Sequence, residues 1–564
     1  MALEGGKKSV AKKSATKKAA AKKTGAKKSA ARGADAKKAP SKKSLGKKSP
    51  GRKTPPRKAS SKSAGARKPI RGRRDWREGL SARKQAILKH IDGIAGKRDD
   101  WRNRNAGFYA DDTAFMRFLI PEGARILDLG CGTGTLLADL KPSFGLGIDF
   151  SDNMADVARA NYPEHAYPEL QFRVGDVEAL DRLSEEIEGP FDFILLSDTL
   201  GYLDDCQAML EQLHAFCDEE TRIVVTYYSH LWEPVLRLGE LAGLKMPQPE
   251  VNFLSPSDIA NILDLADFDV IKTEWRQLVP ARLFGLGTFI NRFIGTLPLI
   301  RKLSLRHFIV ARSLTKAKRK DLSTTVLVPC RNEKGNIESA ITRLPRFCKD
   351  LEVLYVEGNS SDGTFEECER VRDHYAKPEN GAWDIKVFKQ PGKGKGDAVR
   401  KGFDEARGDI LMILDADLTM PPEELPKFYE AIASGKGEFI NGSRLVYPME
   451  KGAMRFLNYW ANRTFAMIFS FLLNQRFTDT LCGTKVLTKA DYEKIRAGRT
   501  YFGDFDPFGD FDLIFGAAKQ NLKIIEIPMR YADRTYGEPQ ISRFRDGWLL
   551  LKMVVFAWRK LKAF

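Results

Sequence analysis

The 564-residue sequence lacks long apolar runs, because no stretch reaches the roughly 18 to 20 apolar residues that a membrane-spanning helix needs. Its N-terminus also lacks the apolar core of a secretory signal. The seven cysteines include no C-x-x-C pair, and the six histidines are scattered. The sequence therefore predicts neither a zinc site nor a disulfide framework, and it fits a reducing compartment.

Acidic residues are nearly absent from residues 1–74. This segment has 27 Lys and Arg against two acids, whereas the remaining residues have 66 against 72, so the formal charge of +19 comes from the tail alone. Lys-Lys pairs recur five residues apart, a period that matches neither a helix nor a strand. With almost no apolar bulk, the segment cannot offset its ordering entropy, so we predict a disordered tail.

Three uses of this tail stay open. It could bind nucleic acid through phosphate contacts and counterion release. It could hold the protein on an anionic membrane, at about 1 kcal/mol per basic residue near the surface. It could also be a solvated extension without a dedicated partner. In composition alone it resembles the lysine-rich tails of linker histones, and the C-terminal segment described below favours the membrane.

The length allows two to four domains, and the first is indicated by R-I-L-D-L-G-C-G-T-G-T at residues 125–135. A β-type run here enters a turn with three glycines, which let the backbone turn sharply and let a ligand approach. Asp149 ends a second predicted strand, where an acid can accept hydrogen bonds from ribose hydroxyls. Asp176 ends a third strand, and helical patterns lie between the strands, as in a doubly wound sheet.

These motifs resemble the class I S-adenosylmethionine-dependent methyltransferases over residues 126–225. The resemblance implies a Rossmann-like fold with S-adenosylmethionine (SAM) as cofactor. In such a site the glycine turn cradles the methionine moiety, Asp149 binds the ribose, and Asp176 lies beside the adenine. The cofactor-binding residues implied are Asp128, Gly130, Gly132, Gly134, Asp149, Asp176 and Val177. The sulfonium is already activated, so the protein mainly supplies position and orientation.

No motif identifies the methyl acceptor. The residues at positions where acceptors bind in similar enzymes are Tyr109, Ser197, Asp198, Tyr202, Tyr228, His230 and Trp232. Each of them also fits a packing or hydrogen-bonding role, and His230 is the strongest candidate for a general base. Residues 281–310 mix large apolar residues with arginines, which favours either an interfacial segment or a cap over the sheet.

A second α/β pattern begins after a polar linker at residues 316–322. Its first strand ends at Pro329, and its second enters a polar turn, S-S-D-G-T. G-K-G-K-G-D-A, residues 392–398, then opens a helix. Glycines and a helix N-terminus favour phosphate, and Lys393 and Lys395 add positive charge.

The stretch I-L-M-I-L-D-A-D, residues 410–417, is a short apolar run that ends in Asp415 and Asp417. Such runs are typical of buried parallel strands, and open α/β folds bind ligands at the carboxyl edge of the sheet. Alternate residues of an extended chain point the same way, so we expect both carboxylates to reach one cation. Oxygen ligands suit Mg²⁺ or Mn²⁺, which are often shared with substrate phosphates.

Residues 323–564 resemble the family 2 glycosyltransferases of GT-A fold, and most closely the polyprenyl-phosphate glycosyltransferases of the dolichyl-phosphate mannose synthase type. The stretches that support this are V-P-C-R-N-E, S-S-D-G-T, G-K-G-K-G-D-A, D-A-D, N-G-S-R, T-D-T-L-C-G-T-K, F-G-D-F-D-L and Y-A-D-R-T-Y-G-E. The resemblance implies an NDP-sugar donor. Glu357, Gly358 and Asn359 stand where the family has two adjacent acids and a glycine, so the donor nucleotide stays open.

The resemblance also implies roles for individual residues. The nucleotide sugar would contact Pro329, Asn332, Glu333, Glu357, Asp362, Lys395 and Asp415, and the catalytic set would be Asp415, Asp417, Asp510, Asp512, Arg444 and Arg534. A metal on Asp415 and Asp417 would neutralise the leaving diphosphate. A phosphate acceptor would be clamped by Arg444 and Arg534 and would need no strong base. A hydroxyl acceptor would use Asp510 or Asp512 as its base.

The C-terminal residues 541–564 place Trp548, Phe556 and Trp558 beside basic residues on one predicted helix. This pattern suits a helix that lies in the membrane interface, and packing on the domain core is the alternative. Residues 453–473 have a similar character. Many similar proteins continue into transmembrane helices where this sequence stops, so we expect peripheral attachment at the cytoplasmic face of a membrane.

The sequence thus predicts two doubly wound α/β domains, 75–315 and 323–564, after a disordered tail at 1–74. We expect a bifunctional enzyme that transfers a sugar from an NDP-sugar to polyprenyl phosphate with inversion and a metal, and that methylates a related sugar or glycolipid with SAM. One alternative is a glycosyltransferase that acts on a hydroxyl of a glycan or protein. Another is a scaffold that binds nucleic acid through the tail. The sequence does not indicate an oligomeric state.

Overall fold

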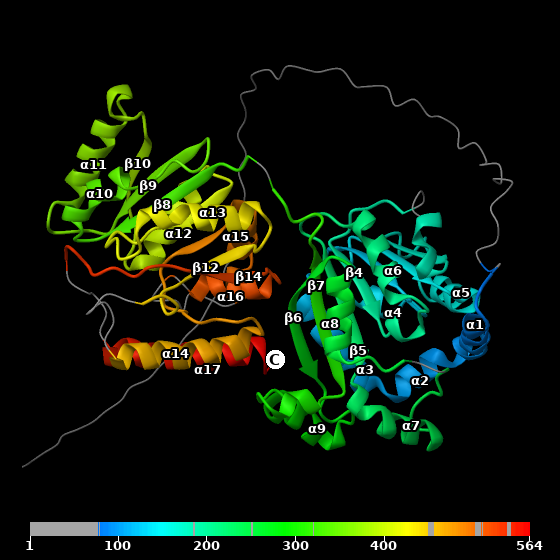
Figure 1. Ribbon diagram of the computed structural model, residues 1–564. Helices are drawn as coiled ribbons and strands as arrows, with labels where there is room; N and C mark the ends of the chain where they lie inside the picture. Colours follow the sequence, from blue (N-terminus) through cyan, green and yellow to red (C-terminus); the bar gives the residue numbers. More distant parts are fainter. Residues whose placement is uncertain are drawn as a thin grey trace, which may run out of the picture. The chain divides into compact units, whose positions relative to one another are not determined.

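The computed structural model describes residues 77, 79–183, 187–249, 252–319, 321–448, 456–501, 509, 511–537 and 543–563. The predicted tail at 1–74 and Asp510 lie outside these residues. The fold contains two seven-stranded sheets with helices on both faces (Figure 1), and both belong to one compact unit, Arg73–Phe564. None of the helices in the described part of the chain has the length and apolar character needed to cross a bilayer.

The first sheet has the strand order β3-β2-β1-β4-β5-β7-β6. Its strands are β1 (Arg125–Leu129), β2 (Phe144–Asp149), β3 (Leu170–Val174), β4 (Phe193–Ser197), β5 (Arg222–Tyr228), β6 (Phe268–Arg276) and β7 (Arg306–Ser313). The first five strands are parallel to one another, and β7 runs antiparallel between β5 and β6. The doubly wound α/β class is therefore confirmed, with the addition that the sheet is mixed.

The helices of this half connect the strands and cover the sheet. They are α1 (Ala82–Ile94), α2 (Arg98–Arg104), α3 (Ala106–Leu119), α4 (Thr135–Asp139), α5 (Asp152–Asn161), α6 (Cys206–Gln212), α7 (Glu233–Leu241), α8 (Pro256–Leu265) and α9 (Leu286–Phe289). Ser81, Ser151 and Ser255 cap the helices that follow them by accepting a hydrogen bond from a backbone N–H of the first turn. These caps explain why α1, α5 and α8 begin where they do.

The second sheet has the order β10-β9-β8-β11-β13-β12-β14, in which β13 alone runs antiparallel to its neighbours. Its strands are β8 (Thr324–Cys330), β9 (Leu351–Glu357), β10 (Asp384–Lys389), β11 (Ile410–Ile413), β12 (Phe439–Ser443), β13 (Lys485–Thr488) and β14 (Ile524–Pro528). Its helices are α10 (Ile337–Thr342), α11 (Thr364–Tyr375), α12 (Lys395–Glu405), α13 (Leu425–Ala433), α14 (Phe456–Leu473), α15 (Lys489–Ala497), α16 (Phe511–Lys519) and α17 (Arg543–Leu561).

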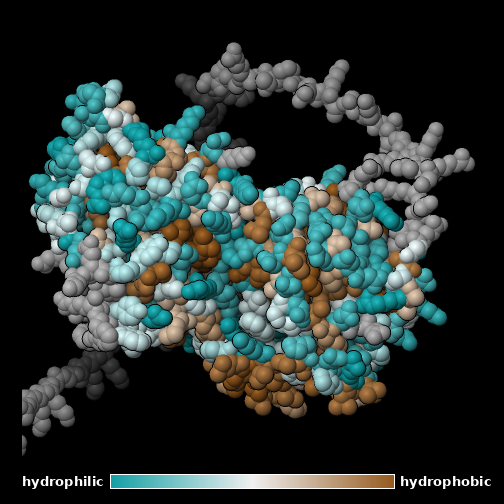
Figure 2. All heavy atoms as spheres, viewed as in Figure 1, coloured by the Kyte–Doolittle hydropathy of each residue, from teal (hydrophilic) through white to brown (hydrophobic). Residues whose placement is uncertain are grey.

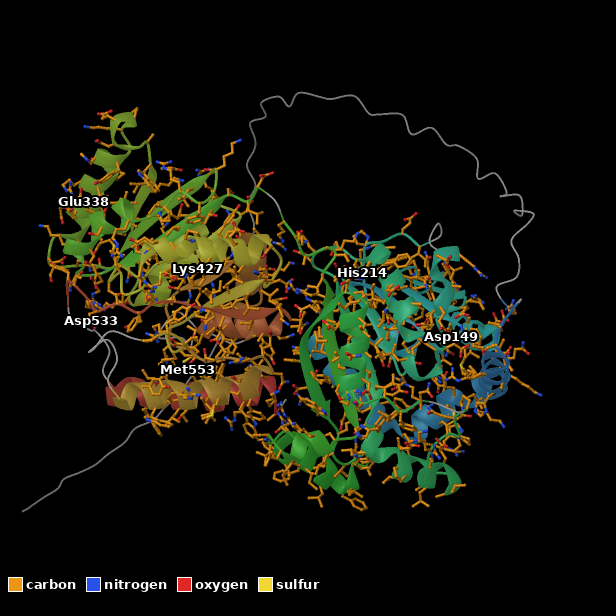
Figure 3. The ribbon with its side chains drawn as sticks, in the orientation of Figure 1. Asp149, His214, Glu338, Lys427, Asp533 and Met553 are labelled. Atoms are coloured by element: carbon orange, nitrogen blue, oxygen red, sulfur yellow. The ribbon has the colours of Figure 1, made fainter. Side chains whose placement is uncertain are left out.

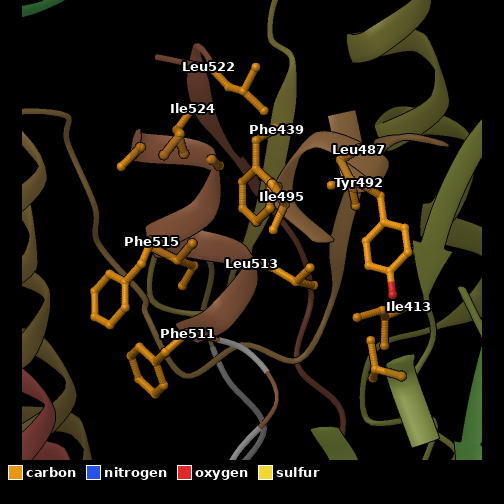
Figure 4. Packing of buried hydrophobic residues seen from close by; sticks show 14 of the residues in the cluster. Ile413, Phe439, Leu487, Tyr492, Ile495, Phe511, Leu513, Phe515, Leu522 and Ile524 are labelled. Atoms are coloured by element: carbon orange, nitrogen blue, oxygen red, sulfur yellow. The ribbon is translucent and has the colours of Figure 1, made fainter. Parts of the chain in front are cut away.

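Apolar side chains from strands and helices fill the space beside this sheet (Figure 4). Phe439 of β12 and Tyr492 of α15 are buried there, and Phe515 of α16 stacks on Phe469 of α14 with ring centroids 5.6 Å apart. A fully buried side chain of this size stabilises the fold by about 1.5–3 kcal/mol. Strands buried on both faces are near-continuous apolar runs, which is why they could be recognised in the sequence.

Helix α17 lies beside α14 (Figure 1) and has two kinds of face. Leu550, Met553 and Ala557 are buried in the domain core, whereas Trp548 and Val555 are exposed. The C-terminal helix therefore packs on the core through one face, and its other face remains apolar and open.

Candidate active sites

A cavity of about 170 Å³ opens at the carboxyl edge of the first sheet, around the turn between β1 and α4. Gly130 and Gly134 in this turn have positive φ angles of 85° and 76°. A Cβ at Gly130 would lie within 3.1 Å of the Thr199 side chain, and one at Gly134 would overlap Phe172. The turn therefore requires glycine at both positions, and its backbone lines the cavity.

Asp128 of β1 lines this cavity and is only 1% exposed. Its Oδ1 atom has no hydrogen-bond partner among the described residues. Burial raises the pKa of Asp128 to about 7, and the nearby Asp149 adds to the shift. A buried carboxylate oxygen without a partner is costly, and an ammonium group in the cavity would satisfy it. The residues present therefore fit the methionine moiety of SAM.

Asp149 ends β2 (Figure 3), and both of its carboxylate oxygens accept backbone hydrogen bonds. The N–H of Gly132 donates to Oδ2 at 2.8 Å, and the N–H of Ser151 donates to Oδ1 at 2.9 Å. These bonds tie the glycine turn to the second strand. Asp149 also lines the cavity, as expected for a residue beside the ribose.

Asp176 caps the short helix that follows β3, and its Oδ1 accepts the N–H of Glu178. Its Oδ2 lies 2.5 Å from Nζ of Lys84, which comes from α1. Val177 is buried beside it and lines the same cavity. The seven residues predicted to bind SAM lie in this turn or at the ends of β1, β2 and β3, and all but Gly134 are among the residues that line the cavity.

Three charged residues at this site were not found from the sequence. Lys84 of α1 pairs with Asp176 and Glu178, and Arg98 of α2 lies against Gly132. Arg306, at the start of β7, also lines the cavity. All three come from elements outside the β1–β4 region, where no local motif indicates a ligand.

 The guanidinium group of Arg306 is buried among three side chains. Its Nε donates to Oδ1 of Asp112 at 3.0 Å, its Nη2 donates to Oγ1 of Thr226 at 2.9 Å, and its Nη1 pairs with Asp198. Burial raises the pKa of Asp198 above its usual range, and Arg306 opposes that shift. Asp198 is therefore held in one position at the cavity wall.

The structure separates the seven residues considered for the methyl acceptor into two groups. Those that line the cavity are Tyr109, Ser197, Asp198, Tyr202 and Tyr228. His230 and Trp232 are not among the described residues of the lining, and His230 is exposed. The structure therefore does not bring His230, the base favoured from the sequence, to the site.

In the second half, Asp415 and Asp417 follow β11 but do not belong to it. The strand ends at Ile413, and the N–H of Leu418 donates to the carbonyl of Asp415 at 3.1 Å, which makes a turn. Leu418 has a positive φ of 50°. The expectation that strand pleating orients the two carboxylates is therefore wrong, because a turn rather than an extended strand presents them.

Asp415 faces several cationic side chains. Nζ of Lys395, the first residue of α12, lies 2.6 Å from its Oδ1. Burial acts to raise the pKa of Asp415, but Lys395, Lys485 and Arg444 together lower it below its usual value. Gly483 lies against this pair so closely that a Cβ would overlap both the carboxylate and the ammonium group.

Arg534 connects two of the predicted site residues. Its Nη1 lies 2.9 Å from Oε1 of Glu333, and its Nη2 lies 2.5 Å from Oδ2 of Asp417. Burial raises the pKa of Glu333, and Arg534 opposes the shift. The loop after β14 therefore reaches the carboxyl ends of β8 and β11.

The residues predicted to hold the nucleotide form one hydrogen-bonded pair of loops at the ends of β8 and β9. Oδ1 of Asn332 accepts the N–H of Ser361 at 2.9 Å, and Asp362 accepts the N–H of Thr364 at 3.0 Å. The buried Glu357 accepts the N–H of Ser360. Pro329 lies in β8 beside them. These contacts hold the loops in place, and they do not identify the donor nucleotide.

Arg444 and Asp512 each have a strong partner elsewhere. Arg444 makes a two-pronged ion pair with the buried Asp479, with Nε–Oδ2 and Nη2–Oδ1 distances of 2.7 and 2.9 Å. Asp512, 8% exposed in its side chain, accepts from Nε of Arg499 at 2.8 Å. Both residues therefore have a structural role, whatever else they do.

The described residues contain no cluster of three or more His, Cys, Asp or Glu that could hold a metal ion. Asp415 and Asp417 supply two carboxylates. A divalent ion bound there would complete its coordination with water and substrate oxygens, which is how Mg²⁺ is commonly held beside phosphates. The donor set therefore fits a shared ion and not a closed protein site.

In comparisons with known proteins, a family model matches part of each half. The methyltransferase domain model matches residues 101–273, and the glycosyl transferase family 2 model matches residues 325–496. A dolichol-phosphate mannosyltransferase of Pyrococcus furiosus is 28% identical over 227 residues, which is 39% of this chain and 60% of the relative. A low-salt glycan biosynthesis hexosyltransferase of Haloferax volcanii is 29% identical over 228 residues, which is 40% of this chain and 51% of the relative.

The chain therefore spans between half and two thirds of the length of these curated relatives. Among solved structures, a SAM-dependent methyltransferase of Thermotoga maritima is 16% identical, with a TM-score of 0.31, over 40% of this chain and 99% of that one.

Proposed function

We propose that this chain, in which a methyltransferase domain is joined to a family 2 glycosyltransferase domain, is a bifunctional enzyme of lipid-linked sugars. The second half transfers a sugar from an NDP-sugar to polyprenyl phosphate with inversion. The first half methylates a related sugar or glycolipid with SAM. The observation that supports sugar transfer best is the contact set at the ends of β8 and β11, where Arg534 bridges Glu333 and Asp417.

The protein's own groups suit a diphosphate leaving group. Lys395 lies at the N-terminus of α12, where backbone N–H groups and the helix dipole also favour an anion. Negative charge grows on the diphosphate during transfer, and fixed cations at that point lower the barrier. The ion pairs of Lys395 with Asp415 and of Arg534 with Asp417 would open when the donor binds.

A phosphate acceptor is already anionic, so the reaction needs a positioned cation more than a general base. Arg534 is the better of the two predicted clamps, because Arg444 is committed to Asp479. Asp512 is held by Arg499, which gives the hydroxyl-acceptor alternative little support. Asp510, the other base considered, lies outside the described residues.

Asp415 and Asp417 would hold Mg²⁺ or Mn²⁺ in this proposal. The ion would supply charge neutralisation at the diphosphate oxygens. In the ligand-free protein Lys395 and Arg534 pair with these carboxylates, so the ion would bind as the two ion pairs open.

SAM use in the first half is supported by the unpartnered Oδ1 of Asp128 in the cavity. The methyl acceptor would enter beside Asp198 and Arg306. A polar cavity end with a fixed carboxylate and guanidinium suits a hydroxyl-rich acceptor such as a sugar, because both groups can hydrogen-bond to hydroxyls.

Attachment to the cytoplasmic face of a membrane completes the proposal. Trp548, Leu551 and Val555 form an exposed apolar face on α17. Lys552 and Arg559 lie on the same helix and can contact anionic lipid headgroups. Polyprenyl phosphate would then be reached from the membrane surface.

The test is incubation of the full chain with labelled NDP-sugars, Mg²⁺ and polyprenyl phosphate, followed by organic extraction. We expect a labelled lipid with one donor, and loss of it in the Asp415→Ala, Asp417→Ala double variant. Gly483→Ala should reduce transfer at least about a hundredfold, since its Cβ would displace the Asp415 carboxylate and misplace charge by about an ångström.

Gly547→Ala is the matched control, because a Cβ there meets no atom within 4 Å. It should transfer sugar at the wild-type rate. The proposal would be wrong if no donor gave a lipid-extractable product, or if the double aspartate variant retained wild-type transfer.

A further inference from the structure

Two segments of the methyltransferase half expose large apolar side chains side by side (Figure 2), over α7 and α9. The first segment is residues 231–244, and the second is residues 281–303. Their exposed apolar residues are Leu231, Val235, Leu238, Leu241, Leu244, Leu283, Phe284, Leu286, Phe289, Phe293, Ile294, Leu297, Leu299 and Leu303. Leu241 is 87% exposed and Leu299 84%, and Phe284 is fully exposed. We call this set the apolar patch.

The apolar patch lies at the same edge of the sheet as the SAM cavity. Segment 231–244 follows β5 soon after Tyr228, and segment 281–303 ends just before Arg306 of β7. Both of these residues line the cavity. Met246, which comes directly after the first segment, lines it too.

Two hydrogen bonds join the segments at their bases. The N–H of Ser229 donates to the carbonyl of Leu305 at 2.7 Å, and Nε1 of Trp232 donates to the carbonyl of Leu303 at 2.8 Å. The two segments are therefore joined at their bases, beside residues that line the cavity.

The charge of the second segment restricts what can cover it. Residues 275–320 contain no Asp or Glu, whereas Arg282, Arg292 and Lys302 are exposed among the apolar side chains. Exposed apolar groups interleaved with bases, without acids, complement the acyl and headgroup zones of an anionic membrane. An ordinary protein surface seldom leaves an apolar area of this size open.

A cap over the sheet, the other expectation for this region, would bury its large side chains. Within the second segment Gly287, Gly295 and Thr296 are buried, and the Phe and Leu side chains point outward. Phe293 also contacts Trp558 of α17, with ring centroids 5.7 Å apart. The apolar patch is therefore continuous with the helix that we propose to lie on the membrane.

We propose that the apolar patch docks the methyltransferase half on an anionic lipid bilayer, so that the mouth of the SAM cavity faces the membrane. This inference does not depend on sugar transfer by the second half. It places the methyl acceptor among molecules that a membrane presents, such as a lipid-linked sugar, because the route into the cavity lies beside the docked surface.

The first test measures partition of the full-length protein onto vesicles of phosphatidylcholine with about a third phosphatidylglycerol. Phe284→Glu with Leu299→Glu should lower the partition coefficient about tenfold or more, because two large apolar side chains lose their lipid contacts. The matched control is Leu265→Glu with Leu314→Glu, two exposed leucines at the opposite edge of the same sheet. The control should bind as the wild type does.

The second test detects insertion of position 284 into the bilayer. Binding through the basic tail alone would not insert this residue. In Phe284→Trp, the added fluorescence should shift to the blue and be quenched by brominated lipids, whereas that of Leu265→Trp should not. Equal partition of the patch and control variants, or an unquenched Trp at position 284, would overturn the proposal. So would a dimer in solution that the patch variant dissociates while its vesicle binding stays unchanged, since a second copy would then cover the patch.

Discussion

At the scale of single residues, burial of the Asp128 carboxylate lowers the stability of the ligand-free protein. Its side chain is buried, Oδ1 has no partner among the described residues, and burial raises its pKa to about 7. In the unfolded chain the same group ionises near its ordinary value. Unfolding therefore releases a proton between about pH 4 and pH 7, and the stability of the ligand-free protein falls as pH rises through that window.

Asp128→Asn removes the ionisable group and keeps its shape. We expect the variant to be more stable than the wild type at pH 8 by a few kcal/mol, about the size that the pKa shift implies, with a smaller difference near pH 5. We also expect its affinity for SAM to fall tenfold or more, because a charge-assisted hydrogen bond is lost. Thermal melts at the two pH values and calorimetric titration with SAM measure both effects.

The control is Asp156→Asn, because Asp156 is 71% exposed in its side chain and lies on the outer part of α5. The variant retains Asp128, so its stability should fall with rising pH as that of the wild type does. A variant of Asp128 that lost stability at pH 8 and kept its SAM affinity would show that the carboxylate has a structural role instead.

At the scale of elements, α16 begins with an acid that ties three helices together. Asp512 accepts from Arg499, which follows α15, and lies 3.5 Å from Nε of Arg400 of α12. α12 is also the helix whose N-terminus holds Lys395. The acid therefore braces the helix that we propose binds the donor phosphate. This role differs from that of a base at the acceptor.

Asp512→Asn separates these two roles. If the side chain braces α12, the variant should melt at a lower temperature, and its free energy of unfolding should fall by about 1–3 kcal/mol. It should keep most of its transfer rate at temperatures well below its melting point. A general base would behave in the opposite way, with unchanged melting and a rate reduced a hundredfold or more. Melting curves and initial rates with saturating donor distinguish them.

Elements also show what the sequence could and could not predict. Glycine turns and apolar runs such as 125–135 and 410–413 depend on nearby residues, so both sheets and the acids at their strand ends could be found. Lys84 and Arg306 could not, because each reaches the cavity from an element with no local motif. The apolar run does not predict the turn that begins at Asp415, because the strand ends at Ile413 and the chain is no longer extended at the two aspartates.

At the scale of the whole molecule, charge is divided unevenly along the chain. Residues 1–74 have 27 bases against two acids, and the rest has a small acidic excess. A polybasic segment of this kind binds anionic surfaces through long-range attraction that salt screens within about 10 Å at 0.1 M. Contacts by apolar side chains respond little to salt.

Deletion of residues 1–72 should therefore change how vesicle binding depends on salt. We expect the truncated protein to bind anionic vesicles more weakly at low salt and to differ little from the full chain at 0.5 M or above, about where screening removes the tail's contribution. SAM affinity and sugar transfer in detergent should be unchanged. A truncated protein that no longer bound SAM would show that the tail takes part in the site.

Arg306 follows Leu303 of the apolar patch by only three residues, and it holds Asp198 at the cavity wall. With the patch held in a bilayer, the enzyme meets its methyl acceptor in two dimensions. The rate then depends on the mole fraction of acceptor in the membrane, and dilution with inert lipid slows methylation even when the amount of acceptor in the tube is constant. Methylation would follow the kinetics of surface dilution.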